Sequence, residues 1–172
     1  MLFKIIGSII VFLSCSFLGY VLSRDCAKRP QQLRELQGLL QMLENQITYL
    51  SDVLAEAFER ISRVGEETGV FFKTAAEILK NGNAVNACDA WEQAVNSCIG
   101  MTALNREDKQ ILLSFGKSLG NTDMEGQIKN IRLTQGHLAI QEKKAEEHRK
   151  KNENMYKSLG VIGGAAIVIV LL

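Results

Sequence analysis

The sequence predicts an all-α protein: an antiparallel bundle of about six helices, flanked by N-terminal and C-terminal transmembrane helices. Three observations lead to this prediction. The chain of 172 residues contains one proline, Pro30, so little interrupts helix formation. After this proline, apolar residues recur in alternating steps of three and four, as on one face of a helix. Two nearly uncharged ends enclose a charge-rich middle, and every acidic residue falls between Asp25 and Glu153.

The N-terminal end is long enough to cross a bilayer. From Leu2 to Leu22 only Lys4 is charged, and a helix of that length covers about 30 Å. A cleaved secretory signal is the alternative, with Lys4 as its basic region and residues 5–13 as its apolar region. The apolar run continues past the place where cleavage is expected. We therefore predict an uncleaved anchor over residues 1–22.

The C-terminal end is shorter. Residues 159–172 carry no charge, and the preceding residues 155–158 extend the segment to about 27 Å at helical rise, which a locally thinned bilayer accommodates. The alternative is a buried helix of a soluble core. Because the chain ends in six apolar residues, we favour a C-terminal transmembrane segment over residues 158–172.

Two spanning ends would place residues 23–157 on one side of the membrane. Basic residues are concentrated at the two ends of residues 23–157, next to the anchors, so the positive-inside rule predicts that this domain is cytoplasmic. The cysteines agree, since this middle region holds an odd number of them and no C-x-x-C pair. Near the second anchor, anionic lipid headgroups are the predicted contacts of Lys143, Lys144, Lys150 and Lys151.

The first helix of the middle region follows Pro30. Its apolar face consists of Leu33, Leu36, Leu40, Leu43, Ile47 and Leu50. The same steps continue through Leu54, Ala57, Ile61 and Val64, so one long coiled-coil helix is an alternative to two helices. Ser51 and Asp52 are favourable N-cap residues. We predict a break at residues 48–52 that joins an antiparallel pair.

Glycine and asparagine mark the later breaks. They delimit predicted helices over residues 70–80, 84–99 and 106–119, whose expected core residues are Phe71, Phe72, Ile78, Leu79, Trp91, Val95, Ile111, Leu112, Phe115 and Leu119. Thr122 and Glu125 have the spacing of a capping box that starts the last helix. Residues 141–154 are polar all round apart from Ala145, and we predict there a solvated stalk or a surface that another protein covers. Ion pairs are expected from Glu146 to Lys150 and from Glu147 to Lys151.

No pattern in the sequence carries enzyme chemistry. The common nucleotide-binding, zinc-protease and serine-hydrolase signatures are absent from the sequence, and we predict a protein that is not an enzyme and needs no cofactor, metal or small-molecule substrate. The net charge of +1 argues against nucleic-acid binding. His137 and His148 are expected to lie on the surface. Small residues four apart favour close helix packing in the two anchors, at Cys15 and Gly19 and at Gly160 and Gly164.

The order and spacing of several landmarks resemble one known family along essentially the whole chain. These landmarks are Lys28-Arg29-Pro30, residues 43–49, Ala90-Trp91-Glu92, residues 115–123 and residues 155–160 before an apolar end. Together they are similar to the stage III sporulation protein AB family of endospore-forming bacteria. The chain departs from many relatives at the first interhelical turn, where it has Leu50-Ser51-Asp52.

The resemblance implies a role that composition alone does not indicate. Members of this family belong to a channel built between mother cell and forespore, and the protein is expected in the outer forespore membrane with its central domain in the mother-cell cytoplasm. That domain is similar to the cytoplasmic domains of the platform protein of type II secretion and type IV pilus machines. The implied partners are the secretion-ATPase-like stage III sporulation protein AA and other channel subunits of the same operon.

Two functions follow from the sequence. The first is a non-enzymatic membrane platform that couples a cytosolic ATPase to the channel assembly, and the alternative is a membrane-anchored regulator or ligand-binding sensor without an assembly role. For the first function, the predicted partner contacts are charged residues at the end of the second helix, Arg60, Arg63, Glu66 and Glu67.

Overall fold

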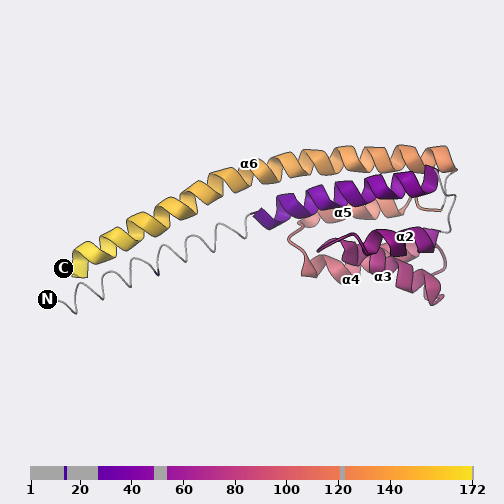
Figure 1. Ribbon diagram of the computed structural model, residues 1–172, viewed down its shortest axis with the longest axis horizontal. Coiled ribbons are helices and arrows are strands. Elements are labelled where there is room, and N and C mark those ends of the chain that lie inside the picture. The colour runs from indigo at the N-terminus through magenta and orange to yellow at the C-terminus, as the bar shows by residue number, and fades with distance from the viewer. Residues whose placement is uncertain (1–13, 15–26, 49–53, 121–122, 172) are drawn as a thin grey trace. The chain divides into compact units, whose positions relative to one another are not determined.

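The computed structural model describes Ser14 and residues 27–48, 54–120 and 123–171, and beyond residue 152 it describes mainly the backbone. Its elements are a helix of residues 27–48, α2 (Leu54–Ser62), α3 (Gly69–Lys80), α4 (Ala87–Cys98), a 3-10 turn (Ile99–Met101), α5 (Arg106–Gly116) and α6 (Met124–Leu171) (Figure 1). None of these described residues forms a strand. The chain divides into two units, one of residues 29–143 and the other of the two ends, up to Lys28 and from Lys144.

Within the 29–143 unit, the 27–48 helix and the first part of α6 run antiparallel, side by side (Figure 1). The Arg132 guanidinium donates to the Glu44 carboxylate at 2.9 Å, and Arg34 donates to Glu142 at 2.9 Å near the opposite end of the pair. Between these contacts the Gln135 side chain donates to the backbone carbonyl of Gln37 at 3.1 Å. The predicted leucine face is the buried face of the 27–48 helix: Leu33, Leu36, Leu40 and Leu43 are fully buried.

The predicted reversal of the chain before α2 is confirmed by contacts between the 27–48 helix and the α2 segment, and residues 49–53 of the predicted break lie outside the described residues. The two helices are antiparallel. Arg60 of α2 donates to Gln46, near the C-terminal end of the 27–48 helix, whereas the backbone N–H of Glu66, after α2, donates to Glu35, earlier in the same helix. The predicted face of α2 was wrong at its end. Val64 lies beyond the last helical residue and is 61% exposed, and the fully buried Phe58 supplies the packing instead.

Four aromatic rings form the centre of the unit. Trp91 of α4 has ring centroids 5.6, 5.0 and 5.3 Å from those of Phe58, Phe72 and Phe115, so one indole touches rings from α2, α3 and α5. The indole N–H donates to the backbone carbonyl of Leu112 at 2.8 Å, which satisfies the buried polar atom. A Cβ on Gly116 would lie 2.5 Å from Trp91 Cδ1, so this position has no room for a side chain.

A buried charge joins three helices at one end of the same unit. The Arg29 guanidinium donates to both carboxylate oxygens of Asp108, at 2.8 and 2.9 Å, and to the Gln141 amide oxygen at 3.1 Å. The Asp108 side chain is fully buried, whereas that of Arg29 is 22% exposed. Asp108 also closes the capping box of α5, since it accepts from the Asn105 N–H while its own N–H donates to the Asn105 side chain. We call Arg29, Asp108 and Gln141 the Arg29 cluster.

Helix ends follow the predicted breaks with small shifts. α4 begins at Ala87 rather than at Ala84, because the Asn86 side chain accepts from the Asp89 N–H and caps the helix. α5 ends at Gly116, but the turn that follows keeps Leu119 buried, and Gly120 then takes a positive φ of 74°. Of the predicted core, Ile78, Leu79 and Ile111 are half-buried, and the other residues are buried.

The start of α6 differs from the predicted capping box. Thr122 lies outside the described residues, and the cap present is Asp123, whose carboxylate accepts from the Gly126 N–H at 3.0 Å. The predicted stalk was also wrong at its beginning: Gln141 is 8% exposed and bonds to Arg29 and Glu107, and Glu142 pairs with Arg34. Exposed side chains in the predicted stalk therefore start at Lys143, not at Gln141.

In the unit of the two ends, α6 continues to Leu171. Glu146 pairs with Arg149 at 2.7 Å, three residues on, and not with the predicted Lys150. In the part of the chain that the structure describes, no helix combines the length and the apolar character needed to cross a membrane. The predicted anchor of residues 1–22, with Cys15 and Gly19, lies outside the described residues except for Ser14, and Gly160 and Gly164 fall on the backbone of α6.

Candidate partner-binding surface

The charged residues predicted to contact a partner lie around one turn. Only Arg60 is in α2; Arg63, Glu66 and Glu67 follow its last residue, Ser62, and lie in the turn of residues 63–68 before α3. We call this segment the α2–α3 turn. A Cβ on Gly65 would lie 2.5 Å from the Gly69 Cα, so glycine is needed where the chain reverses.

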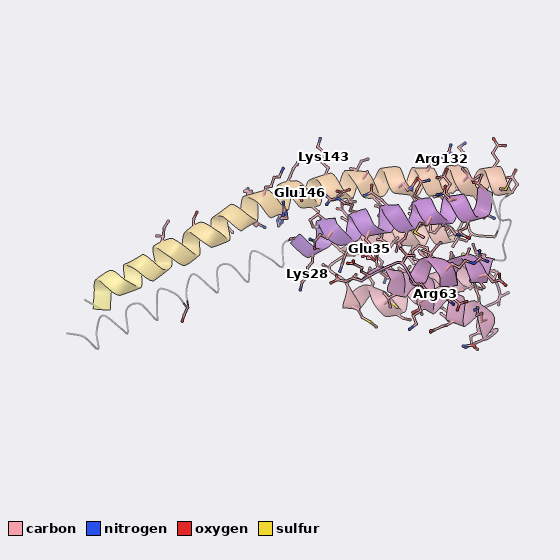
Figure 2. All side chains as sticks on the ribbon, viewed as in Figure 1. Lys28, Glu35, Arg63, Arg132, Lys143 and Glu146 are labelled. Carbon is pink, nitrogen blue, oxygen red and sulfur yellow. The ribbon has the colours of Figure 1, made fainter. Side chains whose placement is uncertain are left out.

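Side chains of the 27–48 helix hold the α2–α3 turn in place. The Glu35 carboxylate accepts from the backbone N–H groups of Glu66 and Thr68, at 2.6 and 3.2 Å. Gln32, which is buried, donates to the Glu67 carboxylate, and its amide oxygen accepts from the Ala103 N–H at 2.7 Å. Figure 2 shows Glu35 on the side of the 27–48 helix that faces the shorter helices. The turn is therefore a fixed feature of the surface.

A groove of about 390 Å³ lies between α2 and α3, and we call it the α2–α3 groove. It is lined by Glu59, Ser62, Arg63, Lys73, Ala76, Glu77 and Lys80. Glu59 accepts from Lys80 and, at 3.1 Å, from Arg63, whose side chain is 73% exposed. The hydrogen bond from Lys80, and then that from Arg63, lower the pKa of Glu59 below its ordinary value of 4.5. Three cations thus surround two carboxylates in an open groove.

A second groove, of about 440 Å³, lies between the 27–48 helix and the α2–α3 turn, and we call it the glutamate groove. All of its lining residues have polar or charged side chains: Gln31, Gln32, Arg34, Glu35, Glu66 and Glu67. The predicted contacts are therefore divided between two surfaces of opposite character. Arg63 belongs to the α2–α3 groove, and Glu66 and Glu67 belong to the glutamate groove.

Arg60 lines neither groove. Its guanidinium lies 3.5 Å from the Glu56 carboxylate and donates to the Gln46 side chain at 3.3 Å. The other predicted contact residues are elsewhere: Lys143, Lys144, Lys150 and Lys151 are exposed on α6. His137 and His148 are exposed as predicted, and no cluster of metal-ligating side chains occurs among the residues described.

Sequence reasoning missed Gln32 and Glu35, which support the turn. The only available signal was weak: both are polar residues next to the buried leucines of one helix, where a polar side chain needs a partner. It also missed Lys73, Glu77 and Lys80, because a helix face lined by charges reads as an ordinary solvated surface until α2 is placed beside it.

The Glu59 contacts predict a pH-dependent loss of stability. Because its pKa is lowered in the folded protein, Glu59 contributes stability above its ordinary pKa of 4.5, and this contribution disappears as the pH falls through the lower folded value. We expect Glu59→Gln to lower the melting temperature slightly at pH 7 and to have a smaller effect at pH 3, where more of the Glu59 carboxyl is protonated. Thermal unfolding at both pH values measures this, with Glu77→Gln as the control. An equal effect of Glu59→Gln at both pH values would contradict it.

Comparison with known proteins identifies the family. The sequence pattern described as stage III sporulation protein AB matches residues 4–172. The chain is 30% identical over 170 residues to stage III sporulation protein AB of Bacillus subtilis (strain 168), a match that covers 98% of this chain and 99% of that protein. A solved structure of a stage III sporulation protein AB, also 30% identical, superposes with a TM-score of 0.68 and covers 72% of this chain and 98% of its own. The chain belongs to the stage III sporulation protein AB family.

Proposed function

We propose that this protein is a non-enzymatic platform of the channel between mother cell and forespore, and that it couples a cytosolic ATPase to the membrane assembly. Membership of a sporulation family supports a role in endospore formation. The platform role rests on the similarity to secretion platform proteins, which is an analogy of fold. In this proposal the central domain lies in the mother-cell cytoplasm, and residues 1–22 and 158–172 anchor it in the outer forespore membrane.

The observation that carries the proposal is the pair of charged grooves on either side of the α2–α3 turn. The hydrogen-bonded α2–α3 turn separates a groove with three cations and two carboxylates from a groove with three carboxylates and one arginine, so the two grooves differ in the sign of their net charge. Complementary charges steer a partner and fix its register more than they add raw affinity. We therefore place the contact with stage III sporulation protein AA on the α2–α3 groove and the glutamate groove.

A charge reversal tests the ATPase contact. We expect full-length protein in detergent micelles to bind purified stage III sporulation protein AA, and the double variant Arg63→Glu/Lys73→Glu to weaken this binding at least tenfold, since reversal replaces two attractions by repulsions. Biolayer interferometry at two salt concentrations measures the affinity. Arg106→Glu is the control, because this exposed residue lies at the first turn of α5, where an acidic side chain is favoured. Equal affinity of the double variant and the wild type would remove the α2–α3 groove from the contact.

The anchors have a separate test. The proposal requires that the full-length chain enter the membrane fraction and that both termini lie on the side opposite to residue 88. Cysteine labelling of intact and permeabilised cells, with single cysteines at the two termini and at Cys88, distinguishes the two sides. Recovery of the full-length chain in the soluble fraction would overturn the membrane part of the proposal.

The lysines near the second anchor complete the proposal. Lys144, Lys150 and Lys151 are exposed on α6 in the unit of the two ends, and contacts with anionic headgroups are worth about 1 kcal/mol for each lysine near the surface. Lys143, the fourth predicted lipid contact, is the last residue of the 29–143 unit and precedes Lys144 directly on α6.

A further inference from the structure

The outer side of α6 in the 29–143 unit carries a short apolar patch between two lysines. Five residues follow one another in steps of four, three, four and three, so they lie on one line along the helix: Lys129, Leu133, Gly136, Ile140 and Lys143. This line is turned away from the buried face of α6, which consists of Ile131, Thr134, Leu138 and Gln141. We call these five residues the α6 outer face.

The α6 outer face is uncovered in the described structure. The side chains of Leu133 and Ile140 are large and apolar, yet they are 52% and 56% exposed. A Cβ on Gly136, between them, would have no atom within 4 Å. Lys143 points outward from α6, away from the 27–48 helix (Figure 2). Two apolar side chains seven residues apart, with glycine between them, form a place where a second helix backbone can approach closely.

The charge of this surface selects the kind of helix that fits. Between Glu125 and Glu146 the only acidic residue of α6 is Glu142, and its carboxylate is turned inward onto Arg34 and Gln37. The outer face is therefore bounded by a lysine at each end and has no carboxylate of its own. Complementary charge requires acidic residues on the occupant about one turn beyond its apolar residues at both ends.

The same charges disfavour a second copy of this chain. If two α6 helices met antiparallel about Gly136, Leu133 of one copy would meet Ile140 of the other, but Lys129 would meet Lys143. A parallel pair would place each lysine beside the same lysine. Like charges in register oppose both arrangements, so the apolar patch alone is self-complementary and the complete face is not.

We propose that the α6 outer face is a docking site for a single amphipathic helix of another protein, with apolar residues seven apart and acidic residues at both ends. The contact is distinct from the proposed ATPase contact: it uses α6 rather than the α2–α3 groove and the glutamate groove. Its partner is defined by chemistry, as an acidic helix that lays its apolar side against Leu133, Gly136 and Ile140.

A peptide of defined sequence tests the proposal. The probe is a fluorescent helical peptide about three heptads long, with leucine seven residues apart at its centre and glutamate at both flanks. We expect it to bind the full-length protein in detergent micelles with a Kd of about 100 µM or tighter, measured by fluorescence anisotropy. A peptide with lysine in place of each glutamate should bind at least about tenfold more weakly.

Variants then assign the binding to this face. Lys129→Glu/Lys143→Glu should weaken the acidic peptide at least about tenfold and strengthen the basic peptide. Gly136→Gln should weaken the acidic peptide without lowering the melting temperature, because glutamine is a better helix former than glycine at an exposed site. Arg106→Glu, at the exposed first turn of α5, is the control and should leave peptide affinity unchanged.

Three results would overturn the proposal. The first is equal binding of the acidic peptide to the wild type and to Lys129→Glu/Lys143→Glu, or no binding of the peptide to the wild type at millimolar concentration. The second is a dimer of the full-length protein that Gly136→Gln dissociates, which would show that the α6 outer face binds a second copy of this chain. The third is binding of the central region to vesicles of anionic lipid that the Leu133→Gln/Ile140→Gln variant abolishes, which would give it to a membrane surface.

Discussion

Trp91→Ala is expected to lower the free energy of unfolding by about 4 kcal/mol, the largest effect of any single substitution considered for this protein. The indole is fully buried and makes ring contacts with Phe58, Phe72 and Phe115, which come from three different helices. Alanine would leave a cavity among rigid rings that have no freedom to collapse into it. Denaturant unfolding of the full-length chain in detergent, followed by circular dichroism, measures the change.

Two further variants separate the contributions of Trp91. Trp91→Phe keeps most of the ring contacts but removes the hydrogen bond to the Leu112 carbonyl, so we expect it to cost about 2 kcal/mol. Met101→Ala is the control, since that side chain is 73% exposed and its loss should change stability by less than about 0.5 kcal/mol. If Trp91→Ala were no more destabilising than Met101→Ala, the aromatic cluster would not be the core of the unit.

Asp108→Ala is expected to cost about 3 kcal/mol. The substitution removes the only carboxylate that the Arg29 guanidinium contacts among the described residues, and it also opens the capping box of α5. The cost of an unpaired buried cation is reduced here because Arg29 is 22% exposed and gains some solvation. The same unfolding measurement applies, with the amide N–H of Asn105 followed by hydrogen exchange as a local readout.

Asp108→Asn is the informative partner of that variant. An asparagine oxygen can still accept from the Asn105 N–H and keep the cap, while the attraction for Arg29 is lost, so its cost should lie between zero and that of Asp108→Ala. Glu142→Gln provides the control, because its partner Arg34 is 65% exposed and an exposed pair contributes less than about 1 kcal/mol. A smaller cost for Asp108→Ala than for Glu142→Gln would show that the Arg29 cluster does not stabilise the fold.

The all-α fold was predictable from local patterns, since apolar period and chain breaks act within a few turns. The leucines from Leu33 to Leu43 identify their own buried face. Gly82 and Gly120 mark helix ends through a positive φ that other residues rarely adopt, and Gly65 marks one through its close approach to Gly69. The predicted helix bounds failed at Val64 and Ala84. The turn after Ser62 ends α2 before Val64, and the Asn86 side chain caps α4 so that it begins after Ala84.

Polar contacts between distant residues were not predictable. In the sequence, Arg29 lies in a basic stretch next to the predicted first anchor, Asp108 in the predicted helix of residues 106–119 and Gln141 in the predicted stalk. Each reading is sound for the segment alone, and only their juxtaposition buries the charge. The candidate site has the same origin: Arg63, Glu66 and Glu67 were predicted as charged contacts, but their division between two grooves depends on Glu35 and Gln32, some thirty residues earlier.

The pairing of the 27–48 helix with α6 imposes an order on biosynthesis. Arg29 and Gln141 are 112 residues apart, whereas α2, α3 and α4 each pack on the next helix in sequence. A nascent chain can therefore assemble the four short helices while translation continues, because nearby contacts close the smallest loops. The side of the 27–48 helix that α6 covers must wait until residues 131–142 leave the ribosome. During that interval the side chains that α6 will cover are exposed, and exposed apolar surface on an incomplete domain is what chaperones bind.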